Sequence, residues 1–342
     1  MTQIVRRGLE DGLWREFLPS EVELSRTLRV SRMTLRASLA ALTKEGLLAA
    51  SRGRKRRILH PSSRRNKTAQ NRLIVLITSK PLESLSTLQI LQVEGLRAHL
   101  AKSGYFLEVQ VGGDAFSAHP VRALERLTVA KPAAAWILLS SSAAMQRWFM
   151  ERNIPCVIVG AAHPGITIPS LGTDYRALGR HAAGMFLRRG HRHLALILPD
   201  DAQAGHANTE AGFAAAAQIE GASVQVIRHN GEPDALMRAI AKLLRHSRPT
   251  GMLVAMPPYV LTTLSALTAA GVGVPRDISL ISRDSDTLLD FMRPSIARYV
   301  IDVPYYVKKI CHATLLVSLG SVPLSLIHIS EPTRLRRISY AV

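Results

Sequence analysis

The sequence predicts an α/β fold in two parts: a small basic domain of helices and a β-ribbon, and a larger body of two lobes with parallel sheets. Its length of 342 residues suits two or three domains. Positive charge is concentrated at the start. Residues 1–71 hold 16 Lys and Arg against 6 Asp and Glu, and the nearly four times longer remainder holds 28 against 19. Beyond residue 71, short apolar runs alternate with amphipathic segments, which is typical of covered parallel sheets.

Composition excludes several classes of protein. Hydrophobic residues make up 47 % of the chain, enough for a large core, so global disorder is excluded. No apolar stretch approaches the ~18 residues of a membrane span, and the charged residues 1–15 lack the apolar run of a secretory signal. Two cysteines, Cys156 and Cys311, make neither a disulfide framework nor a metal cluster. We therefore expect a cytoplasmic protein without contact to a membrane.

Two short helices joined by a tight turn are predicted between residues 18 and 46. Ser20 is the expected N-cap of the first helix, with Glu23 three residues on as in a capping box, and this helix runs to about Leu28. Ser31 caps the second helix, and Gly46 marks its end. Leucines at helical spacing supply the apolar face of the second helix: Leu35, Leu39, Leu42 and Leu47. The pair is typical of a helix-turn-helix.

The first turn of the second helix is placed to reach base edges in the major groove of DNA. The candidate contacts are Ser31, Arg32, Met33, Thr34 and Arg36. An arginine can bond guanine through two hydrogen bonds, and the Thr34 methyl group can touch a thymine methyl group. We expect Arg32 and Arg36 to recognise bases.

A basic β-ribbon, or wing, is predicted next, with strands at 47–50 and 58–59 around a basic turn. Its cations would lie along phosphates and add affinity without sequence information. The candidate contacts are Arg52, Gly53, Arg54, Lys55, Arg56 and Arg57. Residues 61–71 form a predicted linker. The alternatives are a solvated basic tail and a helical hairpin without a DNA role.

This segment resembles the winged helix of the GntR family of bacterial regulators. The matching residues are Leu18-Pro19-Ser20-Glu21, Glu23-Leu24, Val30-Ser31-Arg32, Leu35-Arg36, Leu42, Glu45-Gly46-Leu47 and Gly53. The family usually has an arginine where Val22 stands, so one phosphate or base contact of the family has no counterpart at this position.

Strands and helices alternate from residue 72 onward. The predicted strands are 72–78, 106–111, 135–139, 156–159, 194–198, 224–227, 252–255 and 278–281. The predicted helices are 87–103, 118–129, 142–152, 176–189, 207–220, 233–246, 258–270 and 303–317. The pattern restarts after Asp174, which predicts two lobes. Ligands bind at the carboxyl ends of such strands and in clefts between domains.

This region resembles the effector domain of lactose-repressor-type (LacI) regulators, which share the periplasmic-binding-protein fold. The matching residues are Asp174-Tyr175-Arg176-Ala177-Leu178-Gly179, Gly190-His191-Arg192, Leu194-Ala195-Leu196-Ile197, Gly212-Phe213, Pro275-Arg276-Asp277-Ile278-Ser279-Leu280-Ile281 and Asp284. The resemblance implies interleaved lobes, lobe one at 72–173 and 302–323 and lobe two at 174–301, with crossings near Asp174 and Asp302. The expected fold is thus an N-terminal winged helix-turn-helix (1–60) plus a two-lobed parallel α/β sandwich (72–323).

The same resemblance implies an effector held by strand-end residues of both lobes. The residues at these positions are Ser79, Ser140, Ser141, Asp174 and Asp284. Each could instead be an exposed polar residue of a loop. Thr209 stands where the family often has an arginine, Met256-Pro257 where it has Asn-Asp, and Ile301 where it has a polar residue. The cleft is therefore expected to be less polar than in typical sugar sensors, with His206 and Arg283 as substitute donors beside Thr209.

The sequence indicates neither an enzyme nor a cofactor. It contains no Gly-x-Ser-x-Gly elbow, phosphate loop or dinucleotide fingerprint. His191 and His193 would face opposite ways on a strand, so we expect no metal site there. Cys156 is expected to be buried and inert.

The C-terminal residues 324–342 resemble the translation of a sequencing adapter, and we expect them to be an artefactual tail on a C-terminally truncated chain. In that case the last strand of the family's fold is missing, and lobe one is expected to carry an unpaired sheet edge.

These observations together predict an effector-responsive transcriptional regulator, a repressor that binds a palindromic double-stranded DNA operator as a homodimer. Its effector is a sugar or another small metabolite bound between the lobes. The alternative is a small-molecule-binding α/β protein or enzyme whose basic N-terminus is incidental.

Overall fold

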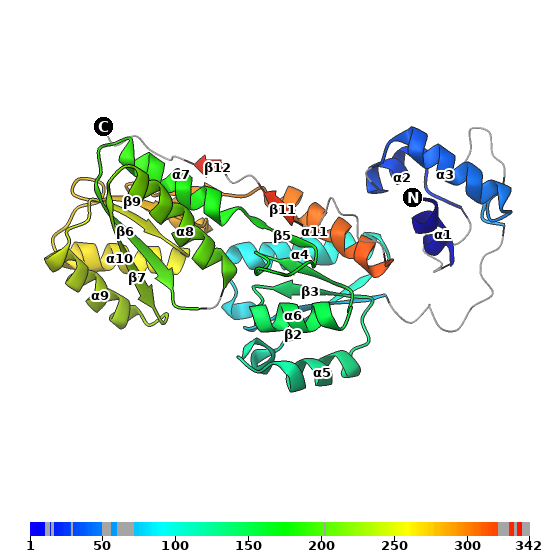
Figure 1. The fold of residues 1–342 in the computed structure, drawn as a ribbon, viewed down its shortest axis with the longest axis horizontal. Helices are drawn as coiled ribbons and strands as arrows, with labels where there is room; N and C mark the ends of the chain where they lie inside the picture. Colours follow the sequence, from blue (N-terminus) through cyan, green and yellow to red (C-terminus); the bar gives the residue numbers. More distant parts are fainter. Residues whose placement is uncertain are drawn as a thin grey trace.

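The computed structural model describes residues 1–10, 14, 17–28, 30–49, 56–59, 72–201, 203–320, 328–331 and 334–336 (Figure 1). The predicted linker and the wing turn with Arg52, Gly53, Arg54 and Lys55 lie outside these residues. The described elements confirm an α/β fold with two parallel-sheet lobes.

The N-terminal domain contains the predicted helix pair, α2 (Glu21–Leu28) and α3 (Arg32–Lys44). Ser20 Oγ accepts a hydrogen bond from the Glu23 amide at 3.2 Å, and Ser31 Oγ accepts one from the Thr34 amide at 3.1 Å. Both predicted N-caps are therefore confirmed. The chain leaves α3 through Gly46, whose φ of 75° is a left-handed conformation that suits glycine.

A third helix, α1 (Thr2–Glu10), was not predicted. It packs against α3 and buries Val5 and Leu9 in the core of this domain. The two sides of the wing meet at a bridge between Leu48 and Ile58, and the Ala49 amide donates to the Arg57 carbonyl at 2.8 Å. The base of the wing is thus a β-ribbon, as predicted.

Lobe one is built on a six-stranded sheet in the order β11-β5-β4-β3-β1-β2. Its strands are β1 (Leu73–Thr78), β2 (Phe106–Val111), β3 (Ala135–Leu139), β4 (Cys156–Val159), β5 (Ser170–Thr173) and β11 (His328–Glu331). Its helices are α4 (Thr87–Lys102), α5 (Val121–Ala130), α6 (Ala143–Glu151) and α11 (Val303–Ser318), with short 3₁₀ turns η1 (Leu82–Ser84) and η2 (Gly113–Phe116). Successive residues of β1 point to opposite faces of the sheet. Ile74 packs with α4 and α11, and Val75 packs with α5 and α6.

Lobe two repeats this plan with the order β12-β10-β9-β8-β6-β7. Its strands are β6 (His193–Pro199), β7 (Ser223–His229), β8 (Gly251–Val254), β9 (Ser279–Ser282), β10 (Ala297–Val300) and β12 (Arg334–Arg336). Its helices are α7 (Tyr175–Leu187), α8 (Ala204–Ile219), α9 (Pro233–His246) and α10 (Pro257–Ala269), with a 3₁₀ turn η3 (Thr287–Phe291). Helices α7 and α8 cover one face of the sheet, and α9 and α10 cover the other.

The chain crosses between the lobes from β5 into α7 and from β10 into α11. Helix α11 returns to lobe one, where Val307 and Ile310 join the core beside α4 (Figure 1). Strands β5 and β10, which lead into the two crossings, were not predicted. The α7–α8 contact in lobe two is very close, because a Cβ atom on Gly212 would overlap the Arg176 carbonyl oxygen.

The expectation of an unpaired edge in lobe one is wrong. Residues 328–331 pair in parallel with β5, and residues 334–336 pair antiparallel with β10. The physical reason is that an edge strand offers a row of free amides and carbonyls, which any extended segment within reach can pair.

We expect Gly212→Ala to lower the free energy of unfolding by about 1–3 kcal/mol, because the neighbouring backbone of α7 cannot yield as a side chain would. Denaturant unfolding of the purified protein measures this. Gly113→Ala is the matched control, since no atom lies within 4 Å of a Cβ there. Equal stability of the two variants would contradict the close α7–α8 contact.

Candidate functional site

Two surfaces gather the predicted functional residues: the start of α3 and a cavity between the lobes. At the start of α3 the side chains divide sharply between core and solvent. Leu35 and Leu39 are buried, whereas Met33 is 76 % exposed and Arg32 and Thr34 are also exposed. The first turn of α3 therefore exposes Arg32, Met33 and Thr34 to solvent. Such exposure is needed for side chains to contact base edges in a groove of DNA.

Arg36 and Arg56 share one carboxylate on this surface. Arg36 Nε lies 2.7 Å from Glu21 Oε2, and Arg56 Nη2 lies 3.4 Å from Glu21 Oε1. The hydrogen bond from Arg36 holds the pKa of Glu21 below its usual range, although burial acts the other way, and Arg56 adds to the lowering. The carboxylate is thus ionised at neutral pH.

Arg56 occupies a different place from the one predicted. It also donates from Nη1 to Thr43 Oγ1 at 3.2 Å, and its side chain is only 19 % exposed. These bonds tie the base of the wing to α2 and α3, so Arg56 is engaged within the protein instead of lying open to phosphates. Arg57, by contrast, is exposed.

The cavity lies between the lobes and has a volume of about 720 Å³. Of the predicted effector residues, six line it: Ser79, Ser140, Ser141, His206, Arg283 and Asp284. Residues that sequence reasoning missed also line it, namely Gln89, Gln92, Tyr175, Tyr259 and Asp286. The sequence signal that could have identified them is their position close to the end of a strand or the start of a helix.

Asp174 and Thr209 are not among the described residues that line the cavity. The Asp174 side chain caps α7 by accepting from the Ala177 amide at 2.9 Å, as Asp302 caps α11 at the other crossing. Thr209 is fully buried and donates to the Gly205 carbonyl within α8. Both side chains therefore have structural roles, and their contact with an effector stays a prediction.

Arg283 is the main cation of the lobe-two wall. It is buried, its Nη2 lies 2.8 Å from Asp284 Oδ2, and its guanidinium carbon lies 4.5 Å from the centre of the Tyr175 ring. Its Nη1 also reaches Thr209 Oγ1 at 3.4 Å. Thr209, on α8, stands where LacI-type regulators often have an arginine. The guanidinium of Arg283 thus reaches this position from another part of the chain. Burial and the Asp284 carboxylate raise the pKa of Tyr175, so its hydroxyl stays neutral.

Two other buried side chains of the cavity also face carboxylates. Arg298, 1 % exposed, is held by Asp290, and His206 Nδ1 lies 2.7 Å from Asp201 Oδ1. Met256, with a left-handed φ of 67°, directs its amide to Asp284 Oδ2 at 3.0 Å. The two buried arginines of this wall, Arg283 and Arg298, are thus each matched by a carboxylate.

Most of the polar groups that lobe one supplies to the cavity are neutral, with Lys80 as an exposed cation among them. Ser140, with a φ of 52°, and Ser141 follow β3, and the buried Gln146 donates to Ser141 Oγ at 3.0 Å. Gln146 also accepts from the His163 amide, which fixes the loop after β4. A hydrogen bond joins the two lobes across the cavity opening, from Thr87 Oγ1 to Asp286 Oδ1 at 3.3 Å.

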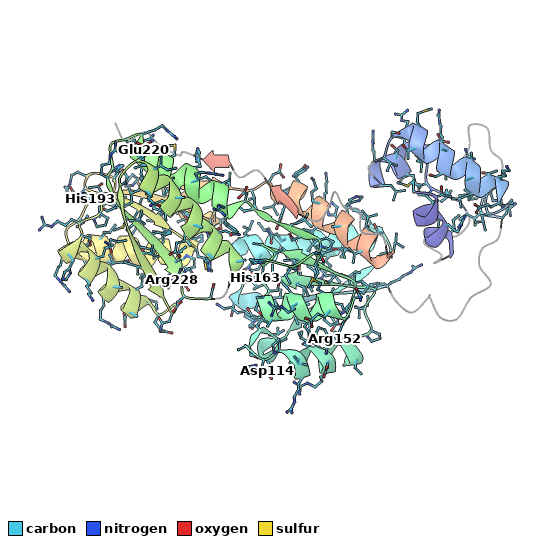
Figure 2. The ribbon with its side chains drawn as sticks, viewed as in Figure 1. Asp114, Arg152, His163, His193, Glu220 and Arg228 are labelled. Atoms are coloured by element: carbon cyan, nitrogen blue, oxygen red, sulfur yellow. The ribbon has the colours of Figure 1, made fainter. Side chains whose placement is uncertain are left out.

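Two ion pairs lie away from the cavity. Figure 2 shows Arg152 on lobe one and Arg228 on lobe two, which pair with Glu125 and Glu210. Among the described residues, no cluster of three or more His, Cys, Asp or Glu is arranged to hold a metal ion. Within the same residues, none of the helices has the length and apolar character to cross a membrane.

Comparison with known proteins assigns both parts of the chain. A model of the bacterial regulatory proteins of the gntR family matches residues 4–58, and a periplasmic binding protein-like domain matches residues 160–321. The chain therefore joins a gntR-type helix-turn-helix to a periplasmic-binding-protein-like domain.

Its relatives are transcriptional regulators. The HTH-type transcriptional regulator DegA of Bacillus subtilis is 24 % identical over 149 residues, 43 % of this chain and 44 % of DegA. The HTH-type transcriptional repressor PurR of Escherichia coli is 27 % identical over 150 residues, 42 % of this chain and 44 % of PurR. The matches thus span less than half the length of either relative.

A solved structure shows the same fold for the two lobes. A regulatory protein of the LacI family from Chloroflexus aggregans superposes with a TM-score of 0.67 at 16 % identity, covering 77 % of this chain and 96 % of that one.

We expect Asp174→Ala to lower the free energy of unfolding by about 1 kcal/mol, because α7 loses its side-chain cap. Asp174→Asn should keep most of the stability, since asparagine caps helices equally well. Thermal and denaturant unfolding of both variants measures this. A loss as large in the asparagine variant would assign the role to the charge of Asp174.

Proposed function

We propose that this protein is an effector-responsive, DNA-binding transcriptional repressor that acts in the cytoplasm. The observation that carries the proposal is the exposed basic first turn of α3, in the same chain as a cavity between two lobes. The likeness to gntR-type and LacI-type regulators supports it.

The DNA-reading part of the proposal comprises residues 1–60, with 61–71 as a linker to the effector domain of 72–323. Arg32 and Arg36 would contact base edges, with Ser31, Met33 and Thr34 beside them. Arg52, Gly53, Arg54, Lys55 and Arg57 would follow the phosphates. A homodimer would place two such readers on a palindromic operator.

The effector would couple to DNA through closure of the lobes. Its binding between Ser141 on one wall and Arg283 on the other would favour one lobe arrangement and so change the spacing of the two readers. The Thr87–Asp286 hydrogen bond across the lips supports such a closed arrangement. A coupling free energy of about 1–3 kcal/mol is typical of such regulators.

The matched charges of the two buried arginines favour an uncharged effector. Arg283 and Arg298 each already face a carboxylate, so an anionic ligand would enter without an open buried cation. Serine hydroxyls and glutamine amides suit hydroxyl or amide groups of the ligand. We therefore propose a neutral sugar or similarly sized hydrogen-bonding metabolite.

Binding-site selection with the full chain tests the DNA-reading proposal. We expect an enriched palindrome, on which Arg36→Ala lowers operator affinity by about 10–100-fold, while affinity for random DNA falls much less. Lys55→Ala should weaken binding to both DNAs and lower the salt slope by about 1. Arg122→Ala, an exposed arginine of lobe one, is the control. Selection of no sequence would favour the alternative of an incidental basic N-terminus.

Thermal unfolding with a compound panel tests the effector class. Neutral sugars and nucleosides are compared with their phosphorylated forms, and a bound effector at 100 times its Kd should stabilise the protein by about 2.7 kcal/mol. Asp284→Asn should weaken its affinity by about tenfold, and Asp277→Asn, outside the cavity, should not. Stabilisation by phosphorylated compounds alone would contradict a neutral effector and leave the DNA-reading proposal intact.

A further inference from the structure

The carboxylate of Glu21 lies between two arginines of the proposed DNA-reading surface. Glu21 is the first residue of α2, Arg36 lies on α3, and Arg56 lies at the base of the wing. One side chain, 30 % exposed, thus joins three separate elements of this domain.

The contact with Arg36 uses a particular atom. Glu21 Oε2 accepts from Nε of Arg36, at 2.7 Å, and the Arg36 side chain is 61 % exposed. A guanine can be recognised by two parallel donors of the guanidinium fork. An arginine held through Nε can therefore present Nη1 and Nη2 outward in a fixed plane.

A negative charge on a DNA-facing surface also has a cost. Phosphates repel a carboxylate, so Glu21 weakens the attraction of this surface to any DNA. The position of the Glu21 carboxylate beside two arginines is explained if it restrains the positions of their guanidinium groups. Without it, Arg36 would be free to move to phosphates, and Arg56 would be held more weakly, by its hydrogen bond to Thr43.

We infer that Glu21 is a positioning residue that sets sequence specificity, by aiming Arg36 at bases and by fixing the wing through Arg56. This inference rests on the proposed function and extends it. The Glu21 carboxylate would then lower the affinity for random DNA. It would also raise the ratio of the affinity for the operator to the affinity for random DNA.

A structural role alone predicts a different outcome. Ion pairs between partly exposed groups contribute little to stability. A purely structural Glu21 would reduce binding to operator and random DNA in the same proportion, through partial loss of the folded domain.

The experiment uses the full chain, its selected operator duplex and a shuffled duplex of the same composition, with affinity measured by fluorescence anisotropy over a salt series. We expect Glu21→Gln to weaken operator binding by about tenfold and to strengthen random binding by about two- to fivefold. The salt slope on random DNA should steepen by about 1, because a released arginine reaches a phosphate.

Glu45→Gln is the matched control, since it removes the same charge from an ion pair with Arg6 in the same domain. Its specificity ratio should stay within about twofold of the wild type. The unfolding midpoint of each variant shows whether the domain is intact.

A double-mutant cycle separates positioning from general effects. If Glu21 acts through Arg36, the double variant Glu21→Gln with Arg36→Gln should discriminate no less than Arg36→Gln alone. Additive losses would overturn the inference, as would an unchanged ratio or an equal loss on both DNAs in Glu21→Gln. A wild-type chain that selects no operator would overturn the proposed function itself.

Discussion

The architecture depends on one constraint, which is that the strands of a parallel sheet must be covered on both faces. Successive residues such as Ile74 and Val75 are fully buried on opposite sides of β1. Helices therefore cover both faces of the sheet in each lobe. The sites open to a small molecule are then the ends of the strands. Because Ser140 and Arg283 both follow carboxyl ends of strands, the two lobes present these ends to a common cavity.

Both proposed sites contain an arginine that is paired with a carboxylate. Each strongly held arginine has a carboxylate partner in the chain: Arg283 with Asp284 in the cavity, and Arg36 with Glu21 near the DNA-reading surface. In the buried cavity the partner avoids the high free energy of an isolated buried cation. On the exposed surface the partner fixes direction, because solvent already stabilises the charge there.

Much of the fold could be predicted, because strong patterns fix local structure. The bounds of β2, β3, β4 and α9 match the predicted segments, since these runs have clear apolar periodicity. Helix α1 was missed because its described buried apolar side chains, Val5 and Leu9, are too few to form a clear helical pattern in a segment rich in charge. Strand β10 was missed because it contains Arg298, whose burial depends on Asp290.

The sites were harder to predict than the fold, for a physical reason. An aspartate that caps a helix and one that binds a ligand can occupy the same sequence position, and only the Ala177 amide distinguishes the role of Asp174. The same holds for Arg56, whose partners Glu21 and Thr43 lie far away in the chain. Strand-end serines were placed correctly at the cavity because topology alone determines where such ends lie.

The return of α11 to lobe one has a consequence for synthesis on the ribosome. Lobe two is encoded entirely between β5 and α11, apart from the short β12, so its strands and helices emerge before lobe one has received Val307 and Ile310. Until then the face of lobe one beside α4 exposes apolar residues to solvent. All of the second lobe except β12 therefore emerges before α11, and the uncovered face of the first lobe is where chaperones would be expected to act.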